Sequence, residues 1–412
     1  MDTPQKEIMM GSQDAAFDFR NSSITNGVQG LECPQARYTE LAEKRVEYVD
    51  GVTNLFRWED ITRINRHPAV LGQGGSGVTL GSARPLIPND IDGPIHARWR
   101  ALLDPMFAPK VVARWEQSFR DLAGELLDRF PAAEKIELNS AYCTPLPSRM
   151  FLNILGAPQD DLAFFLEFKD GVLRPEGKTA EEVVSNSNKA GAKLNAYFAT
   201  MLAQRRAEPE PRDDLIGALM SAELDGEPLT EEQITDILYV MMLAGLDTVT
   251  ATLTLIFSWL ARHPDVRARI VADPSLIPGA VEDIMRFETP VPAVNRHPQE
   301  DIDLGDGLIV RKGETLHCLV AAANVDAAAF PDPLTVDIER PRRTHIAYAS
   351  GTHRCLGSHL ARLELRVAVE ELLRRHPDFE LDAGDPPRYH NVVIRMATRL
   401  PVTFPARNGA QA

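Results

Sequence analysis

Several features that would assign this chain of 412 residues to a specialised class are scarce or missing. Its four cysteines lie 110, 175 and 37 residues apart, which fits neither a small disulfide framework nor paired zinc ligands. No apolar run approaches the roughly 18 residues that cross a bilayer, and the N-terminus resembles no signal peptide. We therefore expect a cytoplasmic protein with no membrane segment.

Positive charge is also deficient, with 44 lysines and arginines against 59 acidic residues and a net charge of −15. Such acidity opposes nucleic-acid binding, which needs a basic surface. The sequence contains no Pro/Gly/Ser-rich linker, low-complexity tract or internal repeat. With 44% hydrophobic and 25% charged residues, it is typical of a soluble globular protein. The pattern favours one large, mostly helical domain over the two or three domains that length alone suggests.

The expected organisation is an N-terminal arm over 1–40, a single domain over 41–405 and a C-terminal tail over 406–412. Two short strands joined at Asp50-Gly51 are predicted between 45 and 60, and a second β-rich sector over 295–320. Helices should occupy 95–290 and 355–376. The stretch 72–93 is rich in glycine and proline and predicts a long irregular loop.

The strongest helix signal runs from Thr230 to Arg262. Thr230 and Gln233 form a capping-box pattern at its start, and His263-Pro264 marks its end. Residues 237–260 are apolar nearly all round, which indicates a buried helix. The run 244–248, Ala-Gly-Leu-Asp-Thr, is anomalous there, because a glycine and a carboxylate both disfavour a buried helix interior.

A second signal is the run 348–357, Tyr-Ala-Ser-Gly-Thr-His-Arg-Cys-Leu-Gly, directly before another helical pattern. Gly351 and Gly357 allow close approach of a flat ligand, and the free N–H groups of a helix start stabilise a sulfur anion at Cys355. The loop therefore predicts a metal thiolate. The other cysteines, Cys33, Cys143 and Cys318, are expected to be small buried hydrophobic side chains.

This run resembles the haem-binding signature of the cytochrome P450 family, with Tyr348 and Ala349 where the family usually has phenylalanine and glycine. The resemblance implies an α+β fold, mainly helical with small β-sheets, in which haem b lies between a long central helix and the cysteine loop. Cys355 would be the iron ligand, with Tyr348 and Gly357 beside the cofactor. A thiolate ligand favours O–O cleavage, so oxygen activation is implied rather than oxygen storage.

The anomalous run on the long helix resembles the family's oxygen-activation segment. The resemblance implies that Ala244 and Gly245 open a groove for dioxygen, and that Leu243, Ala244 and Thr248 face the iron. Thr248 would hydrogen-bond the oxygen being activated, and Asp247 would relay protons through ordered water. The structural alternative is that Asp247 caps a neighbouring element and Thr248 bonds back to the Ala244 carbonyl.

Four further residues match the family's donors to the haem propionates. His96 and Arg100 lie four residues apart on a helix starting near Pro94, which by itself also suits an ordinary surface pair. Arg296 and His353 match the other two donors, giving four for two carboxylates.

A structural charge network is also implied. Asp283 and Arg286 align with the family's Glu-x-x-Arg pair, with Arg340 as the third member and with Glu282 as an alternative partner of Arg286.

The distal pocket is expected to contain apolar side chains, which implies a small hydrophobic substrate held by shape. By analogy it is lined by the loop 77–88, the stretch 164–173, and Val291, Val294, Val393 and Ile394.

The function implied is a monooxygenase that hydroxylates a small apolar molecule, with a terpenoid as the first expectation. Electrons would come from NAD(P)H through a separate ferredoxin and ferredoxin reductase, since no electron-transfer domain is recognisable in the chain. A basic patch for the ferredoxin could be formed by Arg98, Arg114, Arg354, Arg362 and Arg366, although a solvated basic face explains them equally well. The protein is expected to be a monomer. The alternatives are a peroxide-using or isomerising haem-thiolate enzyme and a haem-based sensor of small ligands.

Overall fold

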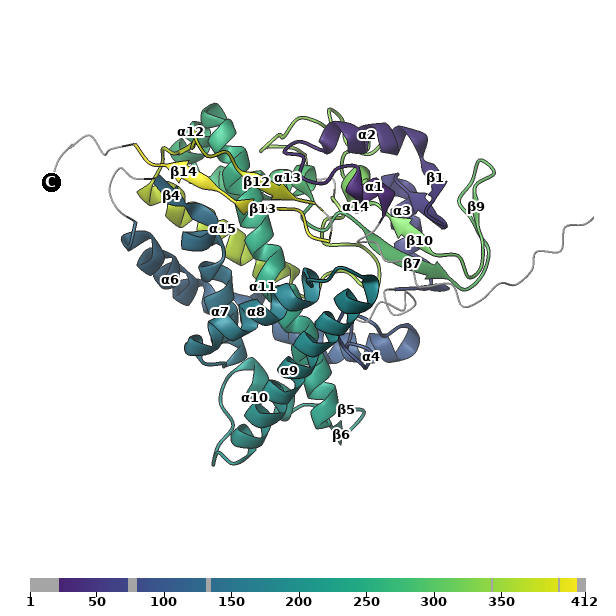
Figure 1. Cartoon of the computed structure of the whole chain (residues 1–412), viewed down its shortest axis with the longest axis vertical. Coiled ribbons are helices and arrows are strands. Elements are labelled where there is room, and N and C mark those ends of the chain that lie inside the picture. The colour runs from purple at the N-terminus through teal and green to yellow at the C-terminus, as the bar shows by residue number, and fades with distance from the viewer. Residues whose placement is uncertain (1–21, 73–79, 131–134, 342–343, 392, 406–412) are drawn as a thin grey trace, which may run out of the picture.

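The protein is mainly α-helical with several small β-sheets, as the sequence predicts. The computed structural model describes residues 22–72, 80–130, 135–341, 344–391 and 393–405. Figure 1 shows a sheet sector with α2, α3 and α14 on one side of the molecule, and the long helices packed together on the other.

The helices are α1 Ser23–Asn26, α2 Gln35–Lys44, α3 Trp58–Arg66, α4 Gly93–Leu103, α5 Pro109–Val112, α6 Glu116–Asp128, α7 Pro145–Leu155, α8 Leu162–Leu173, α9 Ala180–Arg206, α10 Leu215–Met220, α11 Glu231–Arg262, α12 Pro264–Ala272, α13 Ile277–Glu288, α14 Val320–Ala323 and α15 Ser358–Arg375.

The strands are β1 Val46–Val49, β2 Val52–Leu55, β3 Val70–Leu71, β4 Lys135–Glu137, β5 Glu223–Leu224, β6 Glu227–Pro228, β7 Val294–Pro298, β8 Ile302–Asp303, β9 Ile309–Val310, β10 Leu316–Cys318, β11 Glu380–Leu381, β12 Arg388–His390, β13 Met396–Arg399 and β14 Pro401–Thr403. The largest sheet has the order β1-β2-β10-β7-β3, and β10 runs parallel to β2 with Leu316 opposite Thr53.

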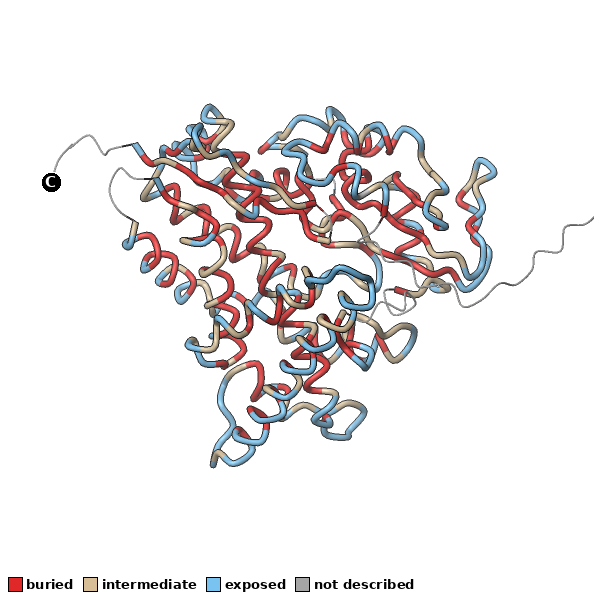
Figure 2. Tube along the Cα trace, in the orientation of Figure 1, coloured by how far each residue is buried: buried red, intermediate tan, exposed pale blue. Residues whose placement is uncertain are grey.

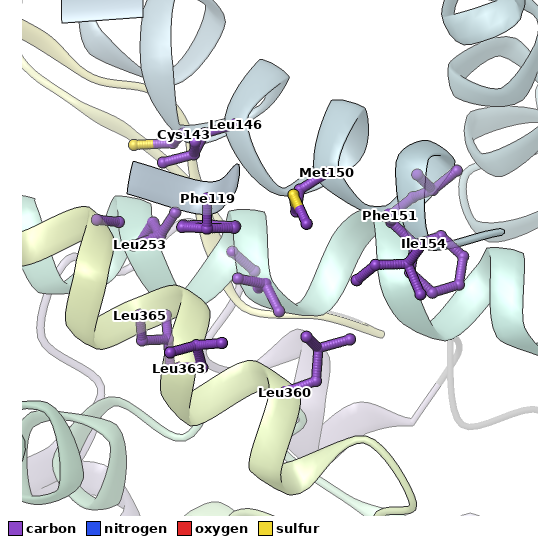
Figure 3. Packing of buried hydrophobic residues seen from close by; sticks show 14 of the residues in the cluster. Phe119, Cys143, Leu146, Met150, Phe151, Ile154, Leu253, Leu360, Leu363 and Leu365 are labelled. Atoms are coloured by element: carbon purple, nitrogen blue, oxygen red, sulfur yellow. The ribbon is translucent and has the colours of Figure 1, made fainter. Parts of the chain in front are cut away.

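The central element is α11, which begins with the predicted capping box. Thr230 Oγ1 accepts from the Gln233 N–H at 3.2 Å, and Gln233 Oε1 accepts from the Thr230 N–H at 2.9 Å. By length and composition α11 could cross a membrane, but most of its apolar length is buried by other helices. Its neighbours include α7, α8, α9, α13 and α15. Figure 2 shows its course as mainly buried, and Figure 3 shows side chains of α7 and α15 gathered around it.

The N-terminal boundary of the domain lies earlier than residue 41. Residues 35–44 form α2, and Tyr38 and Leu41 are buried with Val28 in a hydrophobic cluster that includes Phe56. The polar composition of this stretch suggested an irregular arm, but its apolar residues at helical spacing pack against α14. The domain therefore extends at least from residue 22 to residue 405. Residues 1–21, the tail 406–412 and the first part of the loop 77–88 lie outside the described residues.

The expected charge network is formed, and it links α13 to the segment after α14. Arg286, only 1% exposed, donates to Asp283 at 2.6 Å, and Arg340 donates to the same carboxylate at 3.0 Å. The remaining donors of Arg286 bind the carbonyls of Asn324, Pro333 and Thr335. Aspartate is therefore long enough to replace glutamate here. The alternative partner Glu282 instead binds Arg362 of α15.

We predict that Arg286→Ala lowers the free energy of unfolding by about 3–5 kcal/mol, because it leaves the Asp283 carboxylate buried beside a cavity. Urea unfolding of the purified variant measures this loss. The matched control is Arg311→Ala, which breaks a pair with Asp301 at the surface and should cost no more than about 1 kcal/mol. Equal losses in the two variants would contradict a structural role for the network.

Candidate active site

Cys355 and the oxygen-activation segment meet at one cavity. Cys355 is accessible and lines this cavity together with Thr248 of α11, Tyr348 and His353. The other lining residues are mostly apolar and include Val249, Thr252, Met285, Pro290, Val291, Val294, Val320, Ile346, Ala347, Ala349 and Ala361. Val291 and Val294 therefore lie where the pocket was expected. Leu243, Val393 and Ile394 are not among the described residues that line this cavity; Leu243 and Ile394 are buried in the main hydrophobic cluster, against which Val393 packs.

The cysteine loop is held in a tight conformation before α15. The Cys355 N–H donates to the Tyr348 carbonyl at 2.9 Å. Gly351 has φ +73°, and a Cβ there would lie 1.8 Å from the Asn65 carbonyl oxygen, so only glycine fits. Ala349 also has a positive φ of 56°, which costs an alanine free energy that glycine would not pay. This is the physical consequence of the departure from glycine at position 349.

The surroundings of the Cys355 sulfur favour its anionic form only in part. Although the Cys355 side chain is accessible from the cavity, the protein packed around it removes much of its water and raises the pKa of the thiol, while the Gly357 N–H and the nearby arginines, among them Arg100 and Arg362, act in the opposite direction. A Cβ on Gly357 would meet open space, so the backbone here leaves room for a flat group above the sulfur. Arg100 also braces the loop, since its Nη1 donates to the carbonyls of Thr352 and Arg354 at 3.2 and 2.7 Å.

Two buried cationic or imidazole groups lack the partner that their burial requires. Arg296 is 5% exposed and binds Asn65 Oδ1 and the Asn295 carbonyl, but no carboxylate of the described residues pairs with it. Burial lowers the pKa of Arg296 below its ordinary value. His96 Nε2 is buried with no hydrogen-bond partner in the described parts of the chain, and burial lowers the pKa of His96 to about 4.

These two groups are the donors that anionic propionates need, so the residues present fit a haem. His353 has its ring 4.2 Å from that of His96, but its own nitrogen contacts Asp92 Oδ1 at 2.8 Å. Arg100 Nε donates to Asp104 at 2.7 Å. Of the four expected donors, Arg296 and His96 are thus unpaired with acid, while His353 and Arg100 already have protein partners.

Asp247 and Thr248 face different surroundings. The Thr248 hydroxyl donates to the Ala244 carbonyl at 2.8 Å, as expected for a hydroxyl inside a helix. Asp247 is fully buried and accepts from Lys169 Nζ at 3.0 Å and from Arg174 Nη2 at 2.6 Å. Burial raises the pKa of Asp247, but the two cations outweigh it and hold the pKa below its ordinary value. Asp247 therefore caps no element, and it is ionised at neutral pH.

Gly245 is required by packing against α7. A Cβ at this position would lie 2.9 Å from two ring carbons of Phe151, closer than normal contact. Ala244, in contrast, is exposed although it lies within the central helix. The glycine is therefore explained by the Phe151 ring, without any need for a dioxygen groove at Gly245 itself.

The comparisons with known proteins agree with this geometry. The family model described as cytochrome P450 matches residues 177–399, more than half of the chain. The chain belongs to the cytochrome P450 family. A putative cytochrome P450 123 of Mycobacterium bovis is 34% identical over 77% of this chain and 78% of that protein. The family makes the protein an oxidoreductase of the monooxygenase class with haem as its cofactor.

Solved P450 structures have the same fold. A mutant of P450 EryK in complex with erythromycin B superposes with a TM-score of 0.83 at 27% identity, covering 92% of this chain and 97% of that one. CYP109E1 from Bacillus megaterium, in complex with corticosterone, gives a TM-score of 0.80 at 27% identity, covering 90% and 98%.

Sequence reasoning missed several residues that shape the site. Lys169 and Arg174 hold Asp247, Asn65 connects Arg296 to the cysteine loop, and Glu282 pairs with Arg362, whose guanidinium lies 4.2 Å from the centre of the Tyr348 ring. The only advance signal was Lys169 itself, a cation within the apolar stretch 162–173. The Tyr348 hydroxyl has no hydrogen-bond partner among the described residues, so it forms no bond to the sulfur.

We predict that Gly245→Ala lowers the free energy of unfolding by up to about 2 kcal/mol, because crowding of Phe151 costs about 1–3 kcal/mol and the gain in helix propensity returns about 1 kcal/mol. In a Phe151→Leu background the same substitution should be neutral or stabilising, since the ring is gone. Chemical unfolding of the four proteins of this double-mutant cycle measures the coupling. Equal losses in both backgrounds would show that Phe151 is not the reason for the glycine.

Proposed function

We propose that this protein hydroxylates a small hydrophobic molecule, using electrons from NAD(P)H delivered by a separate ferredoxin and ferredoxin reductase. The observation that carries the proposal is the single cavity lined by both Cys355 and Thr248, with Asp247 next to Thr248 in the chain. A thiolate-bound haem supplies the oxygen-cleaving chemistry when it occupies this cavity.

The site residues described above indicate which side chains would hold the haem. Cys355 would ligate the iron, and Gly357 has no side chain that would obstruct the cofactor. Arg296 and His96 would bind the propionates, and His353 would join them by releasing Asp92. Arg100 contributes mainly by bracing the carbonyls of the cysteine loop.

Proton delivery depends on the ion pairs of Asp247. With Lys169 and Arg174 both bound, its carboxylate has no route to the cavity, because adjacent positions of a helix point about 100° apart. Proton transfer to Thr248 requires the carboxylate to leave at least one cation and reach water beside the Thr248 hydroxyl. Once released from the Ala244 carbonyl, the Thr248 hydroxyl would be free to hold that proton at the cavity it shares with Cys355.

The substrate class follows from the cavity walls. The lining is dominated by valine, alanine, methionine and proline, and its polar side chains include Thr248 and Thr252 of α11. Such a surface selects by shape and offers few polar anchors. A terpenoid fits this description and is our first proposal. The related structures contain erythromycin B and corticosterone, so larger hydrophobic molecules belong in the same screen.

Three of the five arginines proposed from the sequence as ferredoxin contacts already pair with acidic residues of this protein. Arg98 pairs with Asp225, Arg362 with Glu282 at 2.8 Å and Arg366 with Glu116 at 2.8 Å. Arg114 and Arg354 are exposed, and no ion pair involves them within the described parts of the chain. These two arginines, of which Arg354 directly precedes Cys355 in the chain, are the proposed contacts for an acidic ferredoxin.

We also propose a cytoplasmic monomer. The exposed large apolar side chains of the described residues, such as Tyr48, Val184 and Leu334, lie on widely separated elements of the sequence.

The first test is the absorption of the reduced, CO-bound protein. We expect a band near about 450 nm, the family's marker of thiolate ligation, and its loss in Cys355→Ser. Circular dichroism of the serine variant controls for folding. A wild-type band elsewhere would contradict ligation by Cys355.

The second test separates proton delivery from binding. Substrates are found by titrating ferric protein with a library of terpenes, steroids and macrolides, followed by the Soret shift. With NADH, ferredoxin and reductase, Thr248→Ala should keep consuming NADH but form product at least about tenfold more slowly, because a positioned proton donor contributes at least that much. Asp247→Asn should slow NADH consumption itself. Binding of substrate should be unchanged in both.

The matched control for that test is Thr250→Ala. Its hydroxyl makes the same type of bond, to the Leu246 carbonyl at 3.1 Å, but it is buried away from the cavity. Equal loss of product in the Thr248 and Thr250 variants would show a general effect on α11 and would refute the role of Thr248.

A further inference from the structure

Arg395 is a buried guanidinium whose donors are all used. It is 0% exposed, and its Nε and Nη2 donate to Glu288 Oε2 at 3.0 and 2.6 Å. Its Nη1 donates to Asn391 Oδ1 at 2.7 Å and to the Leu31 carbonyl at 3.1 Å, and its Nη2 to the Glu32 carbonyl at 2.7 Å. Five hydrogen bonds match the five N–H groups of an arginine, so the side chain has a single satisfied orientation.

The side chain and the backbone N–H of Arg395 bind the residues on either side of a strained turn. Glu288 is the last residue of α13, and Thr289 follows with φ 38°, a conformation unfavourable for a β-branched residue. The Arg395 N–H donates to the Pro290 carbonyl at 2.7 Å. Arg395 therefore holds the chain both before and after Thr289, and such strain persists only where the surroundings enforce it.

The turn leads directly into the wall of the active-site cavity. Pro290 and Val291 line the same cavity as Cys355 and Thr248. A displacement of the turn would move this apolar wall relative to the cysteine loop. Arg395 itself does not line the cavity, so its influence on the pocket passes through Glu288 and Pro290.

The N-terminal segment 28–35 is the third part of this support. Gln35 Nε2 donates to Glu288 Oε2 at 2.9 Å, and Asn391 Nδ2 donates to the carbonyls of Val28 and Leu31. Glu32 is fixed from the other side by Arg262 at 2.8 Å. A segment some 250 residues away in the sequence therefore completes the surroundings of Glu288 and Arg395.

We propose that Arg395 is a positioning residue that sets the shape of the substrate pocket by holding the Glu288–Val291 turn, and that the N-terminal segment contributes to substrate selection through it. The inference rests on the proposed function, because it assigns this cavity to the substrate. Lysine cannot replace the arginine, since an ammonium has three donors and no planar fork.

The experiment compares a small and a large probe of the same haem. Ferric wild type, Arg395→Lys and Glu288→Gln are titrated with imidazole and with 4-phenylimidazole, followed by the Soret shift. We expect Arg395→Lys to weaken 4-phenylimidazole about tenfold and imidazole less than about twofold, because only the larger probe reaches the wall. Arg399→Lys on β13 is the matched control, since its side chain is 42% exposed and pairs with Asp385, and it should change neither.

The proposal is overturned if Arg395→Lys and Glu288→Gln have the same ratio of the two affinities as the wild type. An equal loss of affinity for both probes is one such result. Failure of the proposed function is distinguishable, because it appears as an abnormal CO-bound band in the wild type itself.

If the variants bind no haem, backbone hydrogen exchange in the variants is compared with that in the wild type to test the proposal. We expect faster exchange in peptides covering 28–38 and 286–296 together, with β4 and β14 unchanged. Unchanged exchange in either of those two peptides overturns the proposal.

Discussion

The structure depends on the burial of α11, a helix too apolar for water that carries one ionised carboxylate in its middle. A buried charge is tolerated only when it is paired, and Asp247 obtains two cations from the end of α8. The packing of α8 on α11 is therefore tied to the ionisation of Asp247. Phe151 of α7 imposes a further condition, because its ring leaves room only for glycine at position 245.

The cavity wall opposite Thr248 is built differently, from segments with little regular structure. The cysteine loop contains positive φ angles at Ala349 and Gly351, and the turn after α13 contains another at Thr289. Arginines hold both segments in one conformation. Arg100 binds the Thr352 and Arg354 carbonyls of the cysteine loop, and Arg395 binds the Glu288 carboxylate and, through its backbone N–H, the Pro290 carbonyl of the turn. Arginine suits this role because its five donors are rigidly arranged.

Much of the fold was predictable because strong local signals decide it. The capping box at Thr230 and the Asp50-Gly51 turn both occur as expected. The N-terminal boundary was wrong because a polar composition concealed an amphipathic helix over 35–44. The prediction that Cys33 is buried was also wrong, since its side chain is exposed beside Arg262. Cys143 and Cys318 are buried as expected. Pairings such as Glu288 with Arg395 span 107 residues and leave no periodic trace in the sequence.

The sequence by itself determined the chemistry: a cysteine at a glycine-bounded helix start and an acid-alcohol pair within a buried helix, since these depend on residue types at short, fixed spacings. The tertiary structure alone decided how those groups are held. It assigned Glu282 to Arg362 and not to Arg286, paired Asp247 with α8, and gave Arg296 no carboxylate partner among the described residues. Such outcomes depend on which charges burial brings within a few ångströms of one another, and that distance is a property of the packed chain.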